Sequence, residues 1–156
     1  MQRTLTIKYQ EFSDAGQLSA ADQELVAAAV AATKNSYAPY SRFHVGAAVR
    51  LENGRIVCGS NQENAAFPSG LCAERTAMFS AAASYPGVPQ VGIAIAAEFE
   101  GQLVDSPASP CGACRQVMAE YQKIGAKPMS IILYGKKRIL RFGKVDDILP
   151  FIFDNI

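Results

Sequence analysis

The chain has 156 residues, of which 49% are hydrophobic and 19% are charged, and its formal net charge is +1. We expect residues 1–156 to form a single domain, because this length suits one hydrophobic core. Acidic and basic residues are dispersed along the chain, which argues against the clustered basic face of a nucleic-acid-binding protein. No apolar run approaches the roughly 20 residues of a membrane span, and the first residues lack the features of a signal peptide. We therefore expect a cytoplasmic protein with no nucleic-acid or membrane partner.

The N-terminal part of the chain predicts a strand followed by a helix. Residues 3–12 alternate loosely between apolar and polar side chains, as a strand does. Ser19 then has the position of a helix N-cap, and apolar residues recur at helical spacing over 20–35. The helix is expected to end before Pro39, because proline disfavours the helical conformation in the residue before it.

The middle of the chain predicts a hairpin and a second helix. Residues 43–51 and 55–59 have strand-like patterns, and the Asn-Gly pair at 53–54 is a strong signal for the hairpin turn between them. The polar stretch 61–71 predicts a loop. Residues 72–83 are rich in Ala, Met and Phe and predict a short buried helix.

The remaining elements continue the alternation of strands and helices. They are a buried strand at 91–97, a helix at 112–124 ended by a glycine cap at Gly125, strands at 130–134 and 138–142, and a short helix or turn at 145–153. A mixed sheet with helices on its faces is the simplest layered arrangement of these elements.

Three of the four cysteines stand at the starts of two predicted helices. Cys72 begins the first, with Glu74 two residues later, and Cys111 and Cys114 begin the second. If the two starts meet in space, they form a three-thiolate metal site with a free fourth position, which is the layout of a catalytic zinc ion. Such a site carries excess negative charge, and the partial positive charge of each helix N-terminus offsets it.

Other interpretations of the thiols stay open. Cys58 could complete a closed four-cysteine structural site, although it lies in a strand-like run rather than at a helix start. Cys111 and Cys114 could form a redox pair, which would leave Cys72 and Glu74 without a role. Outside a metal site, Cys58 is interpreted as a small buried hydrophobic residue.

Three further polar side chains lie near these motifs. Arg75 comes three residues after the predicted ligand Cys72, and Arg115 follows Cys114 directly. We expect both to add hydrogen bonds to the sulfurs or positive charge. His44, the single histidine of the chain, should lie on the opposite face of its strand from Phe43. We interpret it as a surface or hydrogen-bonded histidine rather than a metal ligand.

The motif Cys72-Ala73-Glu74, followed by Pro110-Cys111-Gly112-Ala113-Cys114, resembles the zinc signature of the cytidine deaminases. The resemblance covers about residues 20–153, and its other motifs are Tyr37–Phe43, Val45–Ala48, Asn61–Ala65 and Cys111–Gln116. It implies an α/β fold of three layers, α/β/α, with a five-stranded mixed sheet. A cysteine at position 72 is similar to the short, homotetrameric type of the family, which uses three cysteines.

The resemblance implies zinc-dependent hydrolytic deamination of cytidine and 2′-deoxycytidine to uridine and 2′-deoxyuridine, with release of ammonia, in pyrimidine salvage. One zinc ion per subunit would be held by Cys72, Cys111 and Cys114 and would lower the pKa of a water molecule. Glu74 would take the proton of that water, deliver it to N3 of the pyrimidine and later protonate the departing ammonia. A deaminase of another aminated base and a non-catalytic zinc-binding scaffold remain the alternatives.

The same resemblance assigns contacts to a small-molecule nucleoside. Its base contacts correspond to Phe43 and to the backbone near Ala65, Ala73 and Ser109. Asn61 and Glu63 correspond to ribose contacts, and residues two apart in an extended segment point the same way. The charge of Glu63 would repel a phosphate group, so the resemblance favours nucleosides over nucleotides.

Two aromatic residues are implied to act across subunits of a homotetramer. Phe67 stands where relatives often have tyrosine, and it would reach a neighbouring subunit's site without the hydroxyl contact. Leu149–Phe153 resembles the family's C-terminal Leu-Pro-x-x-Phe, by which Phe153 would close over a neighbour's base. His44 occupies a position where relatives often have proline.

Overall fold

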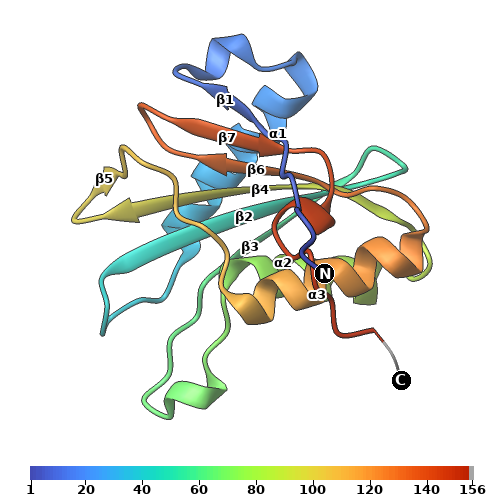
Figure 1. Ribbon diagram of the computed structural model, residues 1–156. Coiled ribbons are helices and arrows are strands. Elements are labelled where there is room, and N and C mark those ends of the chain that lie inside the picture. The colour runs from blue at the N-terminus through green and yellow to red at the C-terminus, as the bar shows by residue number, and fades with distance from the viewer. Residues whose placement is uncertain (155–156) are drawn as a thin grey trace.

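Helices cover both faces of one mixed sheet in the computed structural model, which describes residues 1–154 (Figure 1). The strands are β1 (Gln10–Phe12), β2 (Phe43–Leu51), β3 (Ile56–Ser60), β4 (Gln90–Phe99), β5 (Gln102–Leu103), β6 (Ser130–Tyr134) and β7 (Ile139–Phe142). The α-helices are α1 (Ala20–Ala32), α2 (Ala73–Ser84) and α3 (Gly112–Gly125). Short 3-10 helices are η1 (Ala15–Gln17), η2 (Thr33–Asn35), η3 (Phe67–Ser69) and η4 (Val145–Asp147). Within residues 1–154, none of the helices has the length and apolar character that crossing a membrane requires.

The sheet has the strand order β1-β7-β6-β4-β2-β3, and β5 pairs with β4. β4 lies at its centre, parallel to β6 and antiparallel to β2. The predicted α/β/α fold and mixed sheet are confirmed, and the five longer strands form the expected sheet. Two short strands, β1 and β5, bring the described sheet to seven strands.

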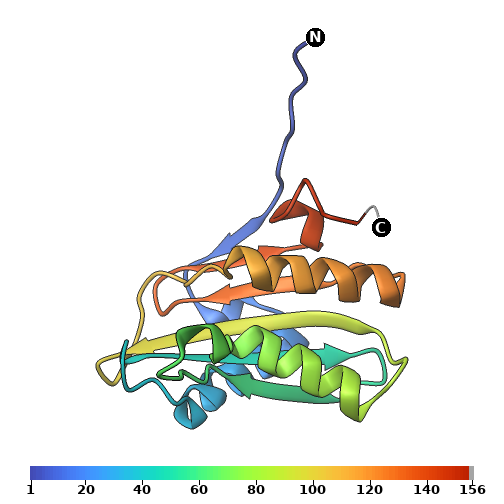
Figure 2. The same cartoon turned by 90° about the horizontal axis from the view of Figure 1, so that it is seen from below.

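The predicted N-terminal strand at 3–12 forms only in its last part. β1 pairs with β7 through residues 10–12, which face 139–141. β7 is only four residues long and extends one residue beyond this pairing, to Phe142, so most of the earlier residues have no strand beside them. Those residues extend away from the body of the molecule (Figure 2), and Leu5 and Ile7 are exposed.

Alternate residues of the central strands build two separate cores. Ile93 and Ile95 of β4 point to the face covered by α2 and α3. Ala94 and Ala96 point to the opposite face, which α1 covers. This alternation follows from the two-residue period of a strand, and it divides the fold into three layers (Figure 2).

Two glycines let the helices lie directly on the sheet. A Cβ added to Gly46 of β2 would lie 2.1 Å from the carbonyl oxygen of Ala29 in α1. A Cβ added to Gly59 of β3 would lie 2.4 Å from the amide nitrogen of Ala77 in α2. The backbone of each helix therefore occupies the space that a side chain would fill, and this fixes the height of α2 above the sheet.

The predicted glycine cap at Gly125 is wrong. Gly125 is the last residue of α3, and the left-handed cap residue is Ala126, with φ of 51°. A Cβ on Gly125 would lie 3.1 Å from Cβ of Pro89, so glycine serves close packing there. The predicted element at 145–153 is a single 3-10 turn, η4, followed by irregular chain.

Replacing Gly46 by alanine is expected to lower the free energy of unfolding by about 2 kcal/mol, because overpacking a filled core costs roughly 1–3 kcal/mol. The new methyl group would force α1 away from β2, and urea denaturation measures the loss. Gly143→Ala is the matched control, since its added Cβ would meet its nearest atom, Asp147 Oδ2, at 3.9 Å. We expect this control to change stability by no more than about 0.5 kcal/mol. Equal stability of the two variants would contradict the close approach of α1.

Candidate metal centre

The starts of α2 and α3 bring three thiols together. Cys72 is the N-cap residue of α2 and Cys111 is the N-cap residue of α3. The Sγ atoms of Cys72 and Cys111 are 3.9 Å apart, and those of Cys111 and Cys114 are 3.5 Å apart. All three sulfurs lie within 4.8 Å of one another. The predicted meeting of the two helix starts is confirmed.

This thiol cluster fits a tetrahedral zinc ion. Zinc–sulfur bonds of about 2.3 Å place the sulfurs of a tetrahedral site about 3.8 Å apart, close to the observed spacing. Cys114 is buried, Cys72 is half-buried and Cys111 is exposed, so the cluster is open on one side. Three thiolates with one open side leave a coordination position for a small molecule, as in catalytic zinc sites.

Positive charge and hydrogen bonds stabilise the thiolate of Cys72. Its hydrogen bond with Cys114 is the largest cause that lowers the pKa of Cys72 to about 5, and the Arg75 guanidinium adds to the effect. Arg75 Nη2 lies 3.6 Å from the Cys72 sulfur, as expected for an arginine that supports a ligand. The hydrogen bonds expected from Arg115 go elsewhere, because its guanidinium donates to the carbonyl oxygens of Pro110 and Ile148. Arg115 therefore ties the start of α3 to the C-terminal segment.

Glu74 lies in the first turn of α2, two residues after the thiol at the helix start. Its side chain is buried, with 5% exposure. Burial raises the pKa of this carboxyl, and the negative charge of Cys72 raises it further. A carboxyl group in such a place can bind a proton closer to neutral pH than an exposed glutamate can.

A cleft of about 580 Å³ runs along one side of the cluster. It is lined by Cys72 and Arg75 and, from the loop that follows β3, by Asn61, Glu63 and Phe67. The structure therefore places one predicted metal ligand, Cys72, and the two predicted ribose contacts, Asn61 and Glu63, on the walls of one cavity.

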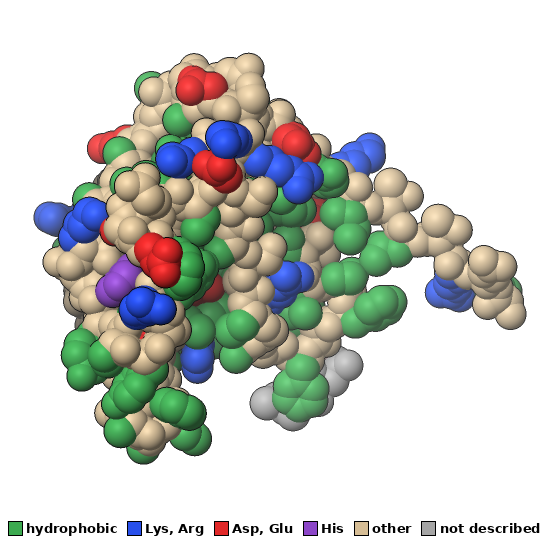
Figure 3. All heavy atoms as spheres, turned by 90° about the vertical axis from the view of Figure 1, so that its left-hand side faces the viewer, with side chains coloured by type: hydrophobic (Ala, Val, Ile, Leu, Met, Phe, Trp, Pro, Cys, Tyr) green, Lys and Arg blue, Asp and Glu red, His purple; other side chains and the backbone are tan. Residues whose placement is uncertain are grey.

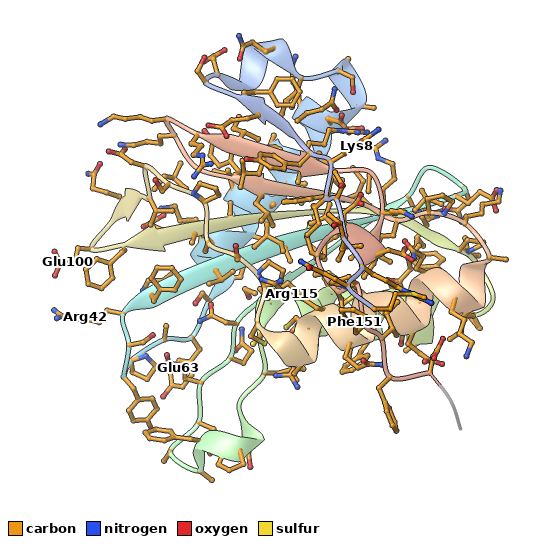
Figure 4. All side chains as sticks on the ribbon, in the orientation of Figure 1. Lys8, Arg42, Glu63, Glu100, Arg115 and Phe151 are labelled. Carbon is orange, nitrogen blue, oxygen red and sulfur yellow. The ribbon has the colours of Figure 1, made fainter. Side chains whose placement is uncertain are left out.

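Hydrogen bonds hold Glu63 in a fixed position on the cleft wall. Its carboxylate accepts from the backbone N–H groups of Tyr40, at 2.8 Å, and Ser41, at 3.2 Å. The Ser41 hydroxyl also donates to it and is the largest cause that lowers the pKa of Glu63. Figure 4 shows Glu63 between its loop and the turn before β2. This carboxylate is therefore charged and joins two loops.

The side-chain amide of Asn61 forms hydrogen bonds with the backbone at the start of β2. Its Oδ1 accepts from the N–H of Val45 at 2.8 Å and from the Ser36 hydroxyl at 2.5 Å, while its Nδ2 donates to the carbonyl of Phe43 at 2.9 Å. Sequence reasoning missed Ser36 and the Ser41 contact to Glu63. No motif or period links such residues, because these hydrogen bonds join positions 22–25 residues apart.

The predicted base contacts lie on four different segments. Phe43 is half-buried at the start of β2, and its ring centroid is 6.4 Å from that of Phe99. Ala73 is fully buried as the first residue of α2. Ala65 is exposed on the loop after β3, and Ser109 is exposed just before α3.

The two aromatic residues predicted to reach neighbouring subunits are both exposed. Phe67 in η3 is 73% exposed and packs edge-to-face on Tyr40, with ring centroids 5.6 Å apart. Figure 3 shows hydrophobic side chains gathered at the tip of this loop. Phe153 is 68% exposed, while its backbone N–H and carbonyl are both bonded to the side chain of Gln116.

Cys58 and His44 lie away from the thiol cluster. Cys58 pairs with Ala48, whose side chain joins the core under α1, so it lies on the opposite face of the sheet from α2. Its expected burial is wrong, because β3 is an edge strand and leaves this side chain exposed. His44 is half-buried with Nδ1 3.1 Å from Ser36 Oγ, which confirms its interpretation as a hydrogen-bonded histidine.

Comparisons with known proteins agree with this geometry. Residues 19–128 match the sequence model of the family described as the cytidine and deoxycytidylate deaminase zinc-binding region. A cytidine deaminase of Sporosarcina psychrophila is 46% identical over 100 residues, which are 64% of this chain and 68% of that protein. A cytidine deaminase of Halalkalibacterium halodurans is 46% identical over 98 residues, or 63% of this chain and 70% of that protein.

Solved structures are similar as well. The crystal structure of cytidine deaminase from Burkholderia pseudomallei has a TM-score of 0.70 and 40% identity, over 83% of this chain and 97% of that chain. The cytidine deaminase from Mycobacterium tuberculosis has a TM-score of 0.65 and 32% identity, over 85% of this chain and 96% of that chain.

Zinc content distinguishes the three-cysteine site from a closed four-cysteine site. We expect Cys58→Ser protein to retain one zinc ion per chain, because Cys58 lies on the opposite face of the sheet. Cys111→Ser protein should lose the metal, because two thiols remain in the cluster. Elemental analysis of dialysed protein measures both. Loss of zinc from the Cys58 variant would instead support a closed site.

Proposed function

This chain belongs to the cytidine and deoxycytidylate deaminase family, and from this premise we propose that it deaminates cytidine and 2′-deoxycytidine, in pyrimidine salvage. Water is consumed, and the products are uridine or 2′-deoxyuridine and ammonia. The observation that carries this proposal is the buried carboxyl of Glu74 beside three converging thiols, of which Cys72 lines a cleft.

The proposed cofactor is one zinc ion per subunit, held by Cys72, Cys111 and Cys114. When bound there, zinc supplies Lewis-acid chemistry that makes a water molecule acidic enough to attack near neutral pH. The protein supplies the charge balance, because two helix N-termini and Arg75 surround the thiolates. The redox alternative for Cys111 and Cys114 finds no support in this arrangement, since Cys72 shares their cluster.

Glu74 is the proposed catalytic acid and base. Its carboxylate takes a proton from the attacking water and delivers it to N3 of the pyrimidine, while the water oxygen bonds to C4. The same carboxylate then takes the remaining proton from the hydroxyl on C4 and passes it to the amino group. The C4–N bond breaks, ammonia leaves and the C4 carbonyl forms. The burial that raises its pKa suits both steps, because one group must accept and release a proton at the same pH.

The walls of the cleft are proposed to select a nucleoside. Asn61 and Glu63 are assigned to the ribose, and Glu63 suits a hydroxyl group because a carboxylate accepts a strong hydrogen bond. The base is assigned to Phe43 and to the backbone near Ala65, Ala73 and Ser109. The fixed negative charge of Glu63 would repel a phosphate group, so nucleosides should be preferred over nucleotides.

We further propose that the chain is a single catalytic domain that assembles into a homotetramer. Phe67 and Phe153 support this assembly, because both rings are largely exposed and would gain burial against another subunit. We also propose a cytoplasmic location, because the four cysteines are free thiols and a reducing compartment keeps thiols reduced.

Ammonia release from cytidine by purified, zinc-loaded protein tests the proposed reaction. Glu74→Gln is expected to lower kcat by roughly 10²–10⁴-fold, because it removes the general acid and base. Its zinc content should be unchanged. Equal turnover by both proteins would contradict the role of Glu74, and the absence of turnover in the zinc-loaded parent would contradict the reaction. Turnover of cytidine 5′-monophosphate as fast as cytidine would contradict the proposed selection by Glu63.

The variant Arg75→Gln tests whether Arg75 tunes the Cys72 ligand or is needed to build the metal site. We expect kcat/KM for cytidine to fall roughly 10- to 100-fold, as for other groups that bond to metal ligands, while zinc remains bound. The reason is the lost contact between Arg75 Nη2 and the Cys72 sulfur, which is 3.6 Å long. Parallel assays of turnover and zinc content decide the matter. If the variant also loses its zinc, Arg75 is needed to build the site rather than to tune it.

A further inference from the structure

We propose that His44 is a positioning residue for nucleoside recognition, acting through Ser36 on the Asn61 amide at the cleft. The inference rests on the proposed function, because Asn61 is assigned to the ribose there. The contacts are a chain of two hydrogen bonds, from His44 Nδ1 to Ser36 Oγ at 3.1 Å and from Ser36 Oγ to Asn61 Oδ1 at 2.5 Å.

The backbone of β2 fixes the orientation of the Asn61 amide. An N–H can only donate, and the N–H of Val45 points to Oδ1 at 2.8 Å. A carbonyl can only accept, and the carbonyl of Phe43 receives the amide NH₂ group at 2.9 Å. Exchanging the oxygen and nitrogen of this amide would break both bonds. The Asn61 atom that faces Ser36 is therefore the oxygen.

This orientation fixes the direction of the remaining bonds. Because the amide oxygen only accepts, the single hydroxyl proton of Ser36 must point to Asn61. Ser36 Oγ then has only lone pairs to offer His44. The Nδ1 atom of His44 must therefore carry a proton and donate it to Ser36. In the neutral imidazole this leaves Nε2 without a proton.

Within residues 1–154, Ser36 is the side chain that is hydrogen-bonded to His44. Its cross-strand neighbour on β4 is Glu98. Oε2 of Glu98 accepts a hydrogen bond from Lys34 Nζ at 2.6 Å and a weaker one from the Thr33 hydroxyl at 3.4 Å. The histidine, purple in Figure 3, lies near the surface with acidic and basic side chains around it.

The hydrogen-bond chain matters because three hydrogen bonds to the protein already fix the Asn61 amide. One hydrogen of Nδ2 bonds to Phe43, so the other is available to a ribose hydroxyl in the cleft. Without the N–H of His44, the Ser36 hydroxyl can turn away and the amide loses one of its supports. The thiols and Glu74 lie on other elements, so the chemical step should be unaffected.

The protonation state of the imidazole is a direct test, and the chain has a single histidine to observe. Nitrogen-15 NMR of labelled protein, at a pH where the ring is neutral, is expected to show the proton on Nδ1. Ser36→Ala should move it to Nε2, the form that free histidine favours. A parent protein with its proton on Nε2 would overturn the proposal.

Steady-state kinetics with cytidine tests the effect on binding. His44→Leu is expected to raise KM roughly 3- to 10-fold with kcat unchanged, as for the loss of one hydrogen bond. His44→Asn should restore KM, because its amide N–H can take the place of Nδ1–H. Unchanged KM in the leucine variant, or an equal rise in the asparagine variant, would overturn the proposal. If the parent shows no turnover, the proposed function fails, while the NMR result still decides the hydrogen-bond chain.

Discussion

The close approach of two helix N-termini is the constraint on which the site depends. Three thiolates around a metal ion would repel one another, and α2 and α3 each direct a partial positive charge at the place where the three sulfurs meet. Gly59 contributes from the sheet, since its missing side chain lets the backbone of α2 rest on β3. The position of Cys72 is therefore set by packing between a helix and a strand. The chemistry at the cluster depends on that packing as much as on the ligands themselves.

The first turn of α2 supplies two functions from neighbouring positions. Cys72 faces the metal site from the helix cap, and Glu74 lies buried within the first turn. Burying a carboxyl group costs free energy, because the charged form loses its hydration. Here that cost has a chemical use. Burial raises the pKa of the Glu74 carboxyl, which helps this group both to accept and to release a proton. The site thus combines a stabilised thiolate and a destabilised carboxylate on one helical turn.

Local patterns predicted the parts of the structure that local physics decides. β2 and β6 begin and end where the sequence indicates, because alternation and β-branched residues define buried strands. The meeting of the thiols was expected from the resemblance of their motifs to a known family, because spacing along the chain does not decide whether two helix starts meet. Other features depend on contacts that no period encodes. Gly125 packs against Pro89 while Ala126 is the cap of α3, the exposure of Cys58 follows from an edge position, and the Ser36 contact joins distant segments.

The short strand β1 has a consequence for how the sheet meets other molecules. An unpaired strand edge offers a row of free N–H and C=O groups to any extended chain, and such edges promote aggregation. β1 pairs with β7 and covers its edge, so the sheet ends on this side in a strand of only three residues. Glu11 in this strand forms an ion pair with Arg138 through two hydrogen bonds. The sheet order ends at β3 on the other side, which is five residues long. The β1 border of the sheet is therefore too short to template a long foreign strand.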